Sequence, residues 1–317
     1  MSARFVGGLS GTAAARVRSA ALLVAAVLLV SISLPAERDH VTAAARASLR
    51  VTRLGHLVPR FRHAIVVVFE NHSARRILGH AGAPFLWLAH HYALLTRYDA
   101  VAHPSLPNYL ALVSGSTQGV RYDCTRCVFS GRNLGETLTA HSLTWKMYVE
   151  HLPLYLRQGP GITGPEKARL PFLYFRNLLG PSGRLTVPLP AFYRDLGRRH
   201  LPSFSLVIPD LCHDMHSCSI AKGDRWMHGF LRRVLQPGLL AKTALFVVFD
   251  EGRWSDVRGS GGRVAAIVAG PLVRPHSVSV APLDHYSLLR TIEDAFGLPA
   301  LGRSASARPI MGIWRRP

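Results

Sequence analysis

Four short apolar runs constrain the fold of this chain more than any other feature of its sequence. Each run is rich in valine or neighbouring aliphatic residues and lacks an alternation of apolar and polar positions, which is typical of strands covered on both faces of a sheet. They lie at Ala64–Phe69, Phe204–Ile208, Leu245–Phe249 and Val264–Ala269. Helical patterns separate them, at Pro107–Val113, Gly223–Leu235 and His285–Phe296. Strands that alternate with helices predict an α/β domain.

Polar side chains follow three of these runs, where a strand is expected to end. Glu70 and Asn71 follow the first, Asp210 to His216 the second, and Asp250 and Glu251 the third. Ligands of α/β sheets gather beyond the carboxyl ends of the strands. Neighbouring carboxylates repel unless a proton or a cation neutralises them, so this pattern predicts a divalent metal ion: Ca²⁺, Mg²⁺, Mn²⁺ or, with histidine ligands, Zn²⁺.

A serine stands at the expected start of a helix in the segment 103–109, which reads HPSLPNY. Ser105 is expected as the N-cap and Pro107 in the first turn, a purely structural interpretation. The same geometry also suits catalysis, because free N–H groups at a helix start hold phosphate oxygens while a hydroxyl attacks phosphorus. Both interpretations remain open on these residues alone.

Five segments together resemble the bacterial phosphoesterase family, which contains secreted acid phosphatases and phospholipases C within the alkaline-phosphatase-like superfamily. They are VVVFENHS (66–73), HPSLPNYLALVSGST (103–117), PDLCHDMHSCSIAKGD (209–224), FDEG (249–252) and DHYSLLRTIEDAFGLP (284–299). The segments occur in the family's order, and the resemblance covers about residues 63–302. It implies a mixed, largely parallel central sheet between helical layers. It also implies hydrolysis of phosphate esters through a phosphoseryl intermediate.

The resemblance further implies roles for individual residues. Ser105 would be the nucleophile, and Asn108 and His103 would contact the phosphate. The metal ligands would be Glu70, Asn71, Asp250 and Glu251, with Asp214 as a further candidate. His213 and His285 match polar positions across the pocket, and one of them is expected to protonate the leaving group because histidine titrates near the working pH.

The expected function is therefore that of an exported, metal-assisted phosphoric monoester hydrolase of the acid phosphatase type. Phosphoinositides and other lipid phosphates are candidate substrates. The first alternative is a phosphodiesterase of the phospholipase C type, which the short sequence after residue 299 disfavours. The second alternative is a catalytically inactive basic protein that binds polyanions.

The first 36 residues predict a secretory signal or an uncleaved membrane anchor. Arg4, Arg16 and Arg18 precede an apolar run that extends from Ala20 through Leu34, which is shorter than a comfortable membrane span. An alanine- and arginine-rich linker is expected at 37–62, followed by the catalytic domain at 63–317.

The four cysteines suit an exported protein. Cys124 and Cys127 are three residues apart and Cys212 and Cys218 six apart, so two local disulfides are expected. A zinc site built from the same four residues is the competing interpretation, although its spacing is poor.

The net charge bears on the partner. Lys and Arg number 38 against 18 Asp and Glu, a formal charge of +20. Such a surplus attracts anionic phosphoesters or anionic lipids, and no nucleic acid partner is expected. A coding bias toward arginine would also account for part of it.

Overall fold

The structure is a computed structural model, and it describes residues 58–80, 84–152, 165–179, 185–236, 238, 242–256 and 260–315. The expected signal or anchor and most of the expected linker lie outside the described residues. Among the described residues, no helix is long and apolar enough to cross a membrane.

An eight-stranded sheet forms the centre of the domain, in the order β5-β4-β6-β1-β7-β8-β2-β9. Its strands are β1 (His63–Phe69), β2 (Ala93–Leu95), β4 (Trp145–Val149), β5 (Thr186–Pro188), β6 (Phe204–Ile208), β7 (Thr243–Phe249), β8 (Ala266–Ala269) and β9 (Ser277–Ser279). Among the strand pairs that the described residues form, β7–β8 and β2–β8 are antiparallel and the others are parallel. Strands β3 (Tyr98–Asp99) and β10 (Leu283–Asp284) pair separately. The expected mixed, largely parallel sheet is confirmed.

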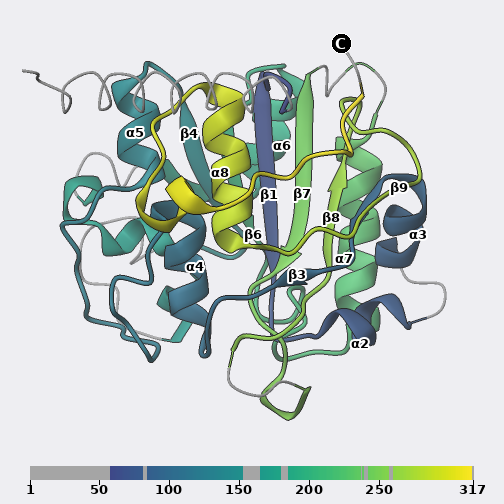
Figure 1. Cartoon of the computed structure of the whole chain (residues 1–317), viewed down its shortest axis with the longest axis horizontal. Coiled ribbons are helices and arrows are strands. Elements are labelled where there is room, and N and C mark those ends of the chain that lie inside the picture. The colour runs from purple at the N-terminus through teal and green to yellow at the C-terminus, as the bar shows by residue number, and fades with distance from the viewer. Residues whose placement is uncertain are drawn as a thin grey trace, which may run out of the picture. The chain divides into compact units, whose positions relative to one another are not determined.

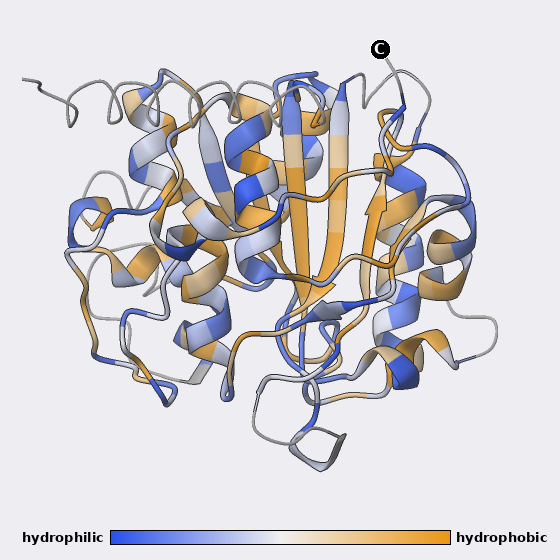
Figure 2. Ribbon diagram, viewed as in Figure 1, coloured by the Kyte–Doolittle hydropathy of each residue, from blue (hydrophilic) through white to orange (hydrophobic). Residues whose placement is uncertain are grey.

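The two central strands determine where the polar residues emerge. Strands β1 and β7 run parallel and in register from His63 opposite Thr243 to Phe69 opposite Phe249. Figure 2 shows both as apolar over most of their length, as expected of strands covered on both faces. The next residues, Glu70 and Asp250, therefore leave the sheet side by side at its carboxyl edge.

Helices cover both faces of the sheet. Helix α4 (Ser105–Ser114) packs against α8 (His285–Phe296) on the near face in Figure 1, and α6 (Pro190–Gly197) and α7 (Ile220–Val234) lie behind the strands. The remaining helices are α2 (Ala74–Leu78), α3 (Pro84–His91) and α5 (Leu134–Ala140). Three short 3₁₀ helices, η2 (Pro165–Arg169), η3 (Pro171–Tyr174) and η4 (Arg176–Leu178), occupy the proline- and glycine-rich middle of the chain.

The expected strands and helices are present, with boundaries shifted by a few residues, but the expected N-cap is wrong. Pro104 is the N-cap of α4 and Ser105 is its first helical residue, with no side-chain cap bond. A distant side chain replaces the cap, because Asp123 Oδ1 accepts the N–H of Leu106 at 2.9 Å. The Ser105 hydroxyl is therefore not used to cap the helix and can contact other groups.

Both expected disulfides are present, Cys124–Cys127 and Cys212–Cys218. All four sulfurs are therefore bonded in pairs, and the alternative of a zinc site made from them is wrong. The second disulfide closes the loop that carries His213 and Asp214.

Candidate active site

Glu70 and Asn71 follow strand β1 directly, and their side chains lie close to each other. Glu70 is buried, and its backbone N–H donates to Asp214 O at 2.9 Å. Asn71 has φ 55°, a left-handed conformation that asparagine tolerates better than most residues. Its side-chain amide donates to Glu70 Oε2 at 3.2 Å and its backbone N–H to Asp250 Oδ1 at 3.0 Å. The ends of β1 and β7 are thus joined.

Helix α4 brings two hydroxyls to the Glu70 carboxylate. Ser105 Oγ donates to Glu70 Oε2 at 3.2 Å, and Tyr109 Oη donates to Glu70 Oε1 at 2.6 Å. The two donors are four residues apart, so they share one face of the helix. Tyr109 was not among the expected site residues, although helical spacing from Ser105 is a signal that could have found it.

Asp250 and Glu251 complete one side of the site at the end of β7. The backbone N–H of Glu251 donates to Asp250 Oδ1 at 2.6 Å. Asp250 Oδ2 is buried and has no hydrogen-bond partner among the described residues. A buried carboxylate oxygen without a donor is costly, so this atom marks a position where a cation would be stabilised.

Asp214 faces a cation that the sequence did not reveal. Its Oδ2 lies 2.7 Å from Arg169 Nη1, which also donates to Pro209 O at 2.7 Å. Both side chains are buried. The expected metal role of Asp214 stays a prediction, and in this structure its partner is a guanidinium. Arg169 lies on η2 in the irregular middle of the chain, where no periodicity pointed to it.

Four buried carboxyls, Glu70, Asp214, Asp250 and Glu251, form what we call the carboxylate cluster. Burial raises the pKa of Glu70 and of Asp250. Burial, reinforced by the charge of Glu70, raises the pKa of Asp214 to about 8 and that of Glu251 to about 9. Arg169 opposes the shift in the pKa of Glu70 and of Asp214. The cluster therefore holds protons at neutral pH unless a further cation replaces them.

The expected phosphate contacts lie beside Glu251. His103 Nδ1 is 2.7 Å from Glu251 Oε2, while its buried Nε2 has no hydrogen-bond partner among the described residues. Burial lowers the pKa of His103. Asn108 accepts the N–H groups of Val101 and Ala102 and reaches Glu251 Oε2 at 3.4 Å. Asn108 therefore holds the segment before α4 in place, and its contact with a phosphate stays a prediction.

His285 is fully engaged within the protein. Its Nε2 lies 2.6 Å from Asp250 O and its Nδ1 lies 3.0 Å from Tyr98 Oη. Since a carbonyl oxygen only accepts, Nε2 carries the hydrogen and Nδ1 accepts from the tyrosine. Burial lowers the pKa of His285 to about 4. This geometry supports the backbone at Asp250, and the expected role of His285 as general acid stays a prediction.

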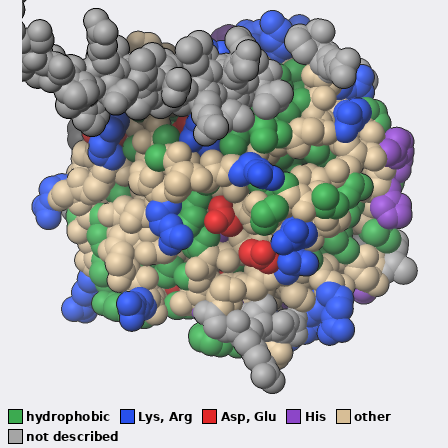
Figure 3. All heavy atoms as spheres, viewed as in Figure 1, with side chains coloured by type: hydrophobic (Ala, Val, Ile, Leu, Met, Phe, Trp, Pro, Cys, Tyr) green, Lys and Arg blue, Asp and Glu red, His purple; other side chains and the backbone are tan. Residues whose placement is uncertain are grey.

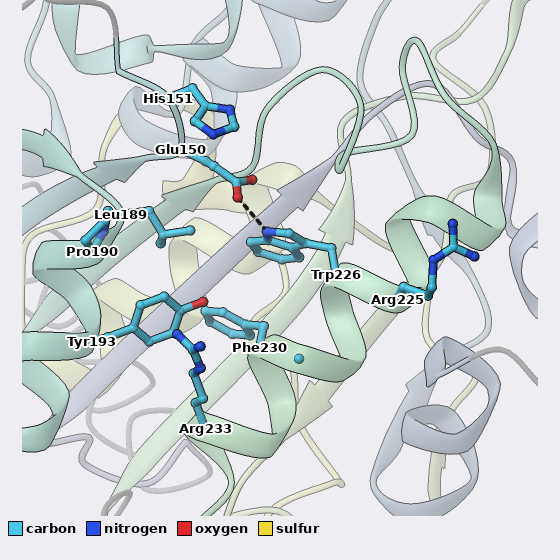
Figure 4. A pocket seen from close by; sticks show the side chains of 10 residues that line it. Glu150, His151, Leu189, Pro190, Tyr193, Arg225, Trp226, Phe230 and Arg233 are labelled. Carbon is cyan, nitrogen blue, oxygen red and sulfur yellow. Dashed lines mark hydrogen bonds between the residues drawn. The ribbon is translucent and has the colours of Figure 1, made fainter.

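His213 lies in a neighbouring group of side chains at the ends of β4 and β6. Its Nδ1 is 3.0 Å from Glu150 Oε2 and 3.4 Å from Asp210 Oδ2, and His151 Nδ1 is 2.8 Å from the same Asp210 atom. Figure 4 shows Glu150 and His151 at a cavity of about 360 Å³ between α6 and α7, where Trp226 donates to Glu150. His213 is thus paired with Glu150 and Asp210.

The donor atoms of the carboxylate cluster suit a divalent metal ion. Glu70, Asp250 and Glu251 offer carboxylate oxygens and Asn71 an amide oxygen, which Ca²⁺, Mg²⁺ and Mn²⁺ prefer. Among the described residues, a tighter group is formed by Glu150, His151 and Asp210, whose ligand atoms lie within 4.8 Å of one another. Two carboxylates of that group are already bound by histidines and Trp226, whereas Asp250 Oδ2 is unpartnered. The unpartnered oxygen favours the carboxylate cluster.

Known proteins match this chain in sequence and in fold. A model described as the Phosphoesterase family matches residues 81–299. A Mycobacterium tuberculosis protein named phosphatidylinositol-3-phosphatase is 34% identical, over 81% of this chain and 84% of its own. A probable acid phosphatase of Kluyveromyces lactis is 27% identical over 80% of this chain, which spans 62% of that relative's length.

Solved structures agree on the fold. A protein in the alkaline phosphatase superfamily from Vibrio parahaemolyticus has a TM-score of 0.56 at 12% identity, over 80% of this chain and 72% of its own. At this identity the likeness shows a shared fold. The chain belongs to the Phosphoesterase family, and its reaction is the hydrolysis of phosphoric esters. The alternative of a catalytically inactive binding protein is not supported.

Proposed function

We propose that this chain hydrolyses phosphoric monoesters with Ser105 as its nucleophile. The observation that carries the proposal is the placement of Ser105 Oγ at the first residue of α4, 3.2 Å from Glu70 Oε2, where against the effect of burial the hydroxyl also lowers the pKa of Asp250 and of Glu251. A helix start favours an anion, since its backbone N–H groups point outward with the positive end of the helix dipole. A phosphate ester held there presents its phosphorus to the hydroxyl.

Each residue has a part in the two displacements. Ser105 Oγ bonds to phosphorus as the bond to the leaving oxygen breaks, and Glu70 Oε2 is placed to receive the hydroxyl proton. The leaving oxygen takes a proton from a histidine, for which we propose His103, whose Nε2 has no hydrogen-bond partner among the described residues, or His213. Water then attacks phosphorus and gives a proton to the histidine, the bond to Ser105 Oγ breaks, and the serine oxygen takes back the proton held by Glu70.

A divalent metal ion held by Glu70, Asn71, Asp250 and Glu251 would neutralise phosphate charge and lower the pKa of the serine hydroxyl. Tyr109 and Asn71 hold the Glu70 carboxylate in one orientation for this purpose. Arg169 keeps Asp214 paired, so that one buried carboxyl of the cluster has a fixed cation.

The substrate class that we propose is the phosphate monoester of a lipid headgroup, with phosphoinositides as the first candidates. The support is the similarity to the relative named phosphatidylinositol-3-phosphatase, of which the match covers 84%. We further propose that the protein is exported. Two disulfides in a chain whose first residues resemble a secretory signal support this placement.

Replacing the nucleophile tests the proposal. Ser105→Ala should lower kcat for p-nitrophenyl phosphate by about a thousandfold or more, because no other hydroxyl replaces it. The exposed Ser130→Ala serves as the control and should keep full activity. Substantial turnover by purified, folded Ser105→Ala would remove Ser105 from its role.

A comparison of products separates the monoesterase from the phospholipase C type of phosphodiesterase. Vesicles that contain phosphatidylinositol 3-phosphate are incubated with the enzyme, and phosphate and diacylglycerol are both measured. We expect phosphate release alone. Diacylglycerol as the main product would establish the diesterase instead.

A further inference from the structure

Two aromatic side chains in segments that contact the start of helix α4 are unusually exposed. Trp254 is 70% exposed and Tyr122 is 62% exposed. Large aromatic side chains usually bury most of their surface, and exposed apolar patches on a soluble domain mark interaction sites. Val128, 40% exposed, adds to the apolar surface of the Tyr122 loop.

Both loops are fixed to the start of helix α4. The Trp254 ring stacks on the His103 ring at 4.5 Å between centroids, and His103 lies two residues before Ser105. In the other loop, Asp123 accepts the N–H of Leu106, the residue after Ser105. The Cys124–Cys127 disulfide then braces that loop next to Val128. The exposed aromatics therefore belong to two segments that both contact the start of α4, where the proposed nucleophile lies.

Arginines accompany the aromatics in both loops. Arg121, Arg126 and Arg253 are exposed, and none of them forms an ion pair with a described residue. Figure 3 shows that Lys and Arg also outnumber Asp and Glu over the face viewed there. Arginines that form no ion pair would be attracted to anionic headgroups. The exposed aromatic rings beside them would contact the apolar region below those headgroups.

We propose that this rim, made of Tyr122, Val128, Trp254, Arg121, Arg126 and Arg253, docks the Ser105 end of helix α4 onto an anionic lipid surface. Tyrosine and tryptophan favour the boundary between headgroups and hydrocarbon, because one end of each ring is apolar and the other polar. Each arginine near an anionic surface adds electrostatic attraction. Docked in this way, the enzyme reaches a headgroup phosphate without extracting the lipid from the bilayer.

The proposal rests on the proposed function, because it assigns the lipid substrate to the Ser105 site. A protein partner is the competing occupant of an exposed aromatic rim. The unpaired arginines and the formal charge of +20 favour an anionic bilayer. The experiment therefore includes an arm that would detect a protein interface between copies of the chain.

Vesicle binding tests the rim without depending on turnover. The protein is sedimented with phosphatidylcholine vesicles that contain or lack phosphatidylserine, a lipid that carries no phosphate monoester. We expect binding that requires phosphatidylserine and weakens with salt. Arg126→Gln should lower the partition coefficient about fivefold, and Tyr122→Ser by a similar factor.

Two control variants lie away from the rim. Arg232→Gln removes an exposed arginine from the last turn of α7, which runs back from the active-site edge, and Trp87→Ala removes a 45% exposed tryptophan from α3. Both should bind vesicles like the wild type. Equal binding by rim and control variants would overturn the proposal. A change of oligomeric state in the rim variants, without any vesicle binding by the wild type, would also overturn it and assign the rim to a protein contact.

An activity arm separates failure of the rim from failure of the function. Tyr122→Ser should hydrolyse soluble p-nitrophenyl phosphate normally while its rate on vesicles with phosphatidylinositol 3-phosphate falls about fivefold. No turnover of either substrate by the wild type would refute the proposed function and leave the vesicle-binding result standing. Turnover of both with equal rates in Tyr122→Ser would refute the rim alone.

Discussion

Tyr109 shows how a single residue can control the chemistry of a neighbour. Its hydroxyl donates to Glu70 Oε1 at 2.6 Å inside a buried site, and this bond lowers the pKa of Glu70 against the effect of burial. Ser105 uses the other oxygen of the same carboxylate. Glu70 thus accepts two hydroxyls at fixed positions, which orients it toward the nucleophile.

Removing that hydroxyl tests its contribution. Tyr109→Phe should lower kcat/KM for p-nitrophenyl phosphate by about ten- to a hundredfold, since a hydrogen bond to a buried charged group is lost. The acid limb of the pH–rate profile should also move to higher pH, because the pKa of Glu70 rises without its donor. Tyr286→Phe, a buried tyrosine that contacts Arg303 instead, is the control. An unmoved profile would mean that Tyr109 only fills space.

Helix α4 depends on how it ends as much as on how it begins. Its C-cap, Gly115, has φ +67°, and a Cβ there would lie 1.8 Å from Leu301 O. The close approach joins the end of α4 to the segment after α8, and Arg303 N donates to Gly115 O at 2.8 Å. This contact helps to position helix α4, whose first residue is Ser105.

Gly115→Ala should therefore destabilise the protein by more than the usual cost of a left-handed alanine. We expect a loss of about 3 kcal/mol or more, because backbone atoms must move apart as well. Gly119→Ala is the matched variant, since Gly119 has φ +73° but nothing within 4 Å of an added Cβ. It should cost only about 1 kcal/mol. Equal losses in urea unfolding would show that the contact with Leu301 is unimportant.

At the scale of the whole molecule, the carboxylate cluster brings together segments that follow three strands. The protonation of these carboxyls therefore affects the stability of the whole fold. Glu70 follows β1, Asp214 follows β6, and Asp250 and Glu251 follow β7. A carboxyl whose pKa rises on folding stabilises the fold fully only below its unfolded pKa of about 4. That contribution is lost as the pH rises toward the folded pKa values of about 8 for Asp214 and about 9 for Glu251.

The metal-free protein should consequently lose thermal stability between about pH 5 and pH 9. Saturating Mn²⁺, Mg²⁺ or Ca²⁺ should raise Tm at the alkaline end by roughly 5–10 °C, because the ion binds the ionised carboxylates of the folded state. Calorimetry with and without the ion measures this, with KCl of equal ionic strength as control. Asp250→Asn should reduce the effect of the ion. The same Tm profile with and without divalent ions would speak against a metal at this cluster.

The sequence by itself determined the fold class and which polar side chains meet at one edge of the sheet. The continuous apolar runs predict that β1, β6 and β7 lie in a sheet covered on both faces. The reason is that apolar side chains point to both faces of such strands and are stable only away from water. Parallel pairing then sends the residues after each run to the same edge. Glu70 and Asp250 could be named in advance for this reason. Ser105 was named from its place at an expected helix start, and the disulfides from local spacing.

Only the tertiary structure decided which partner each polar group meets. Arg169 reaches Asp214 from an irregular segment 45 residues away, and Asp123 caps α4 in place of Ser105. His285 was expected to face the substrate, but its two nitrogens are bound to Tyr98 and Asp250. Local sequence patterns specify periodicity and turns. They carry no information on contacts between distant segments, because such contacts depend on how the packed layers bring those segments together.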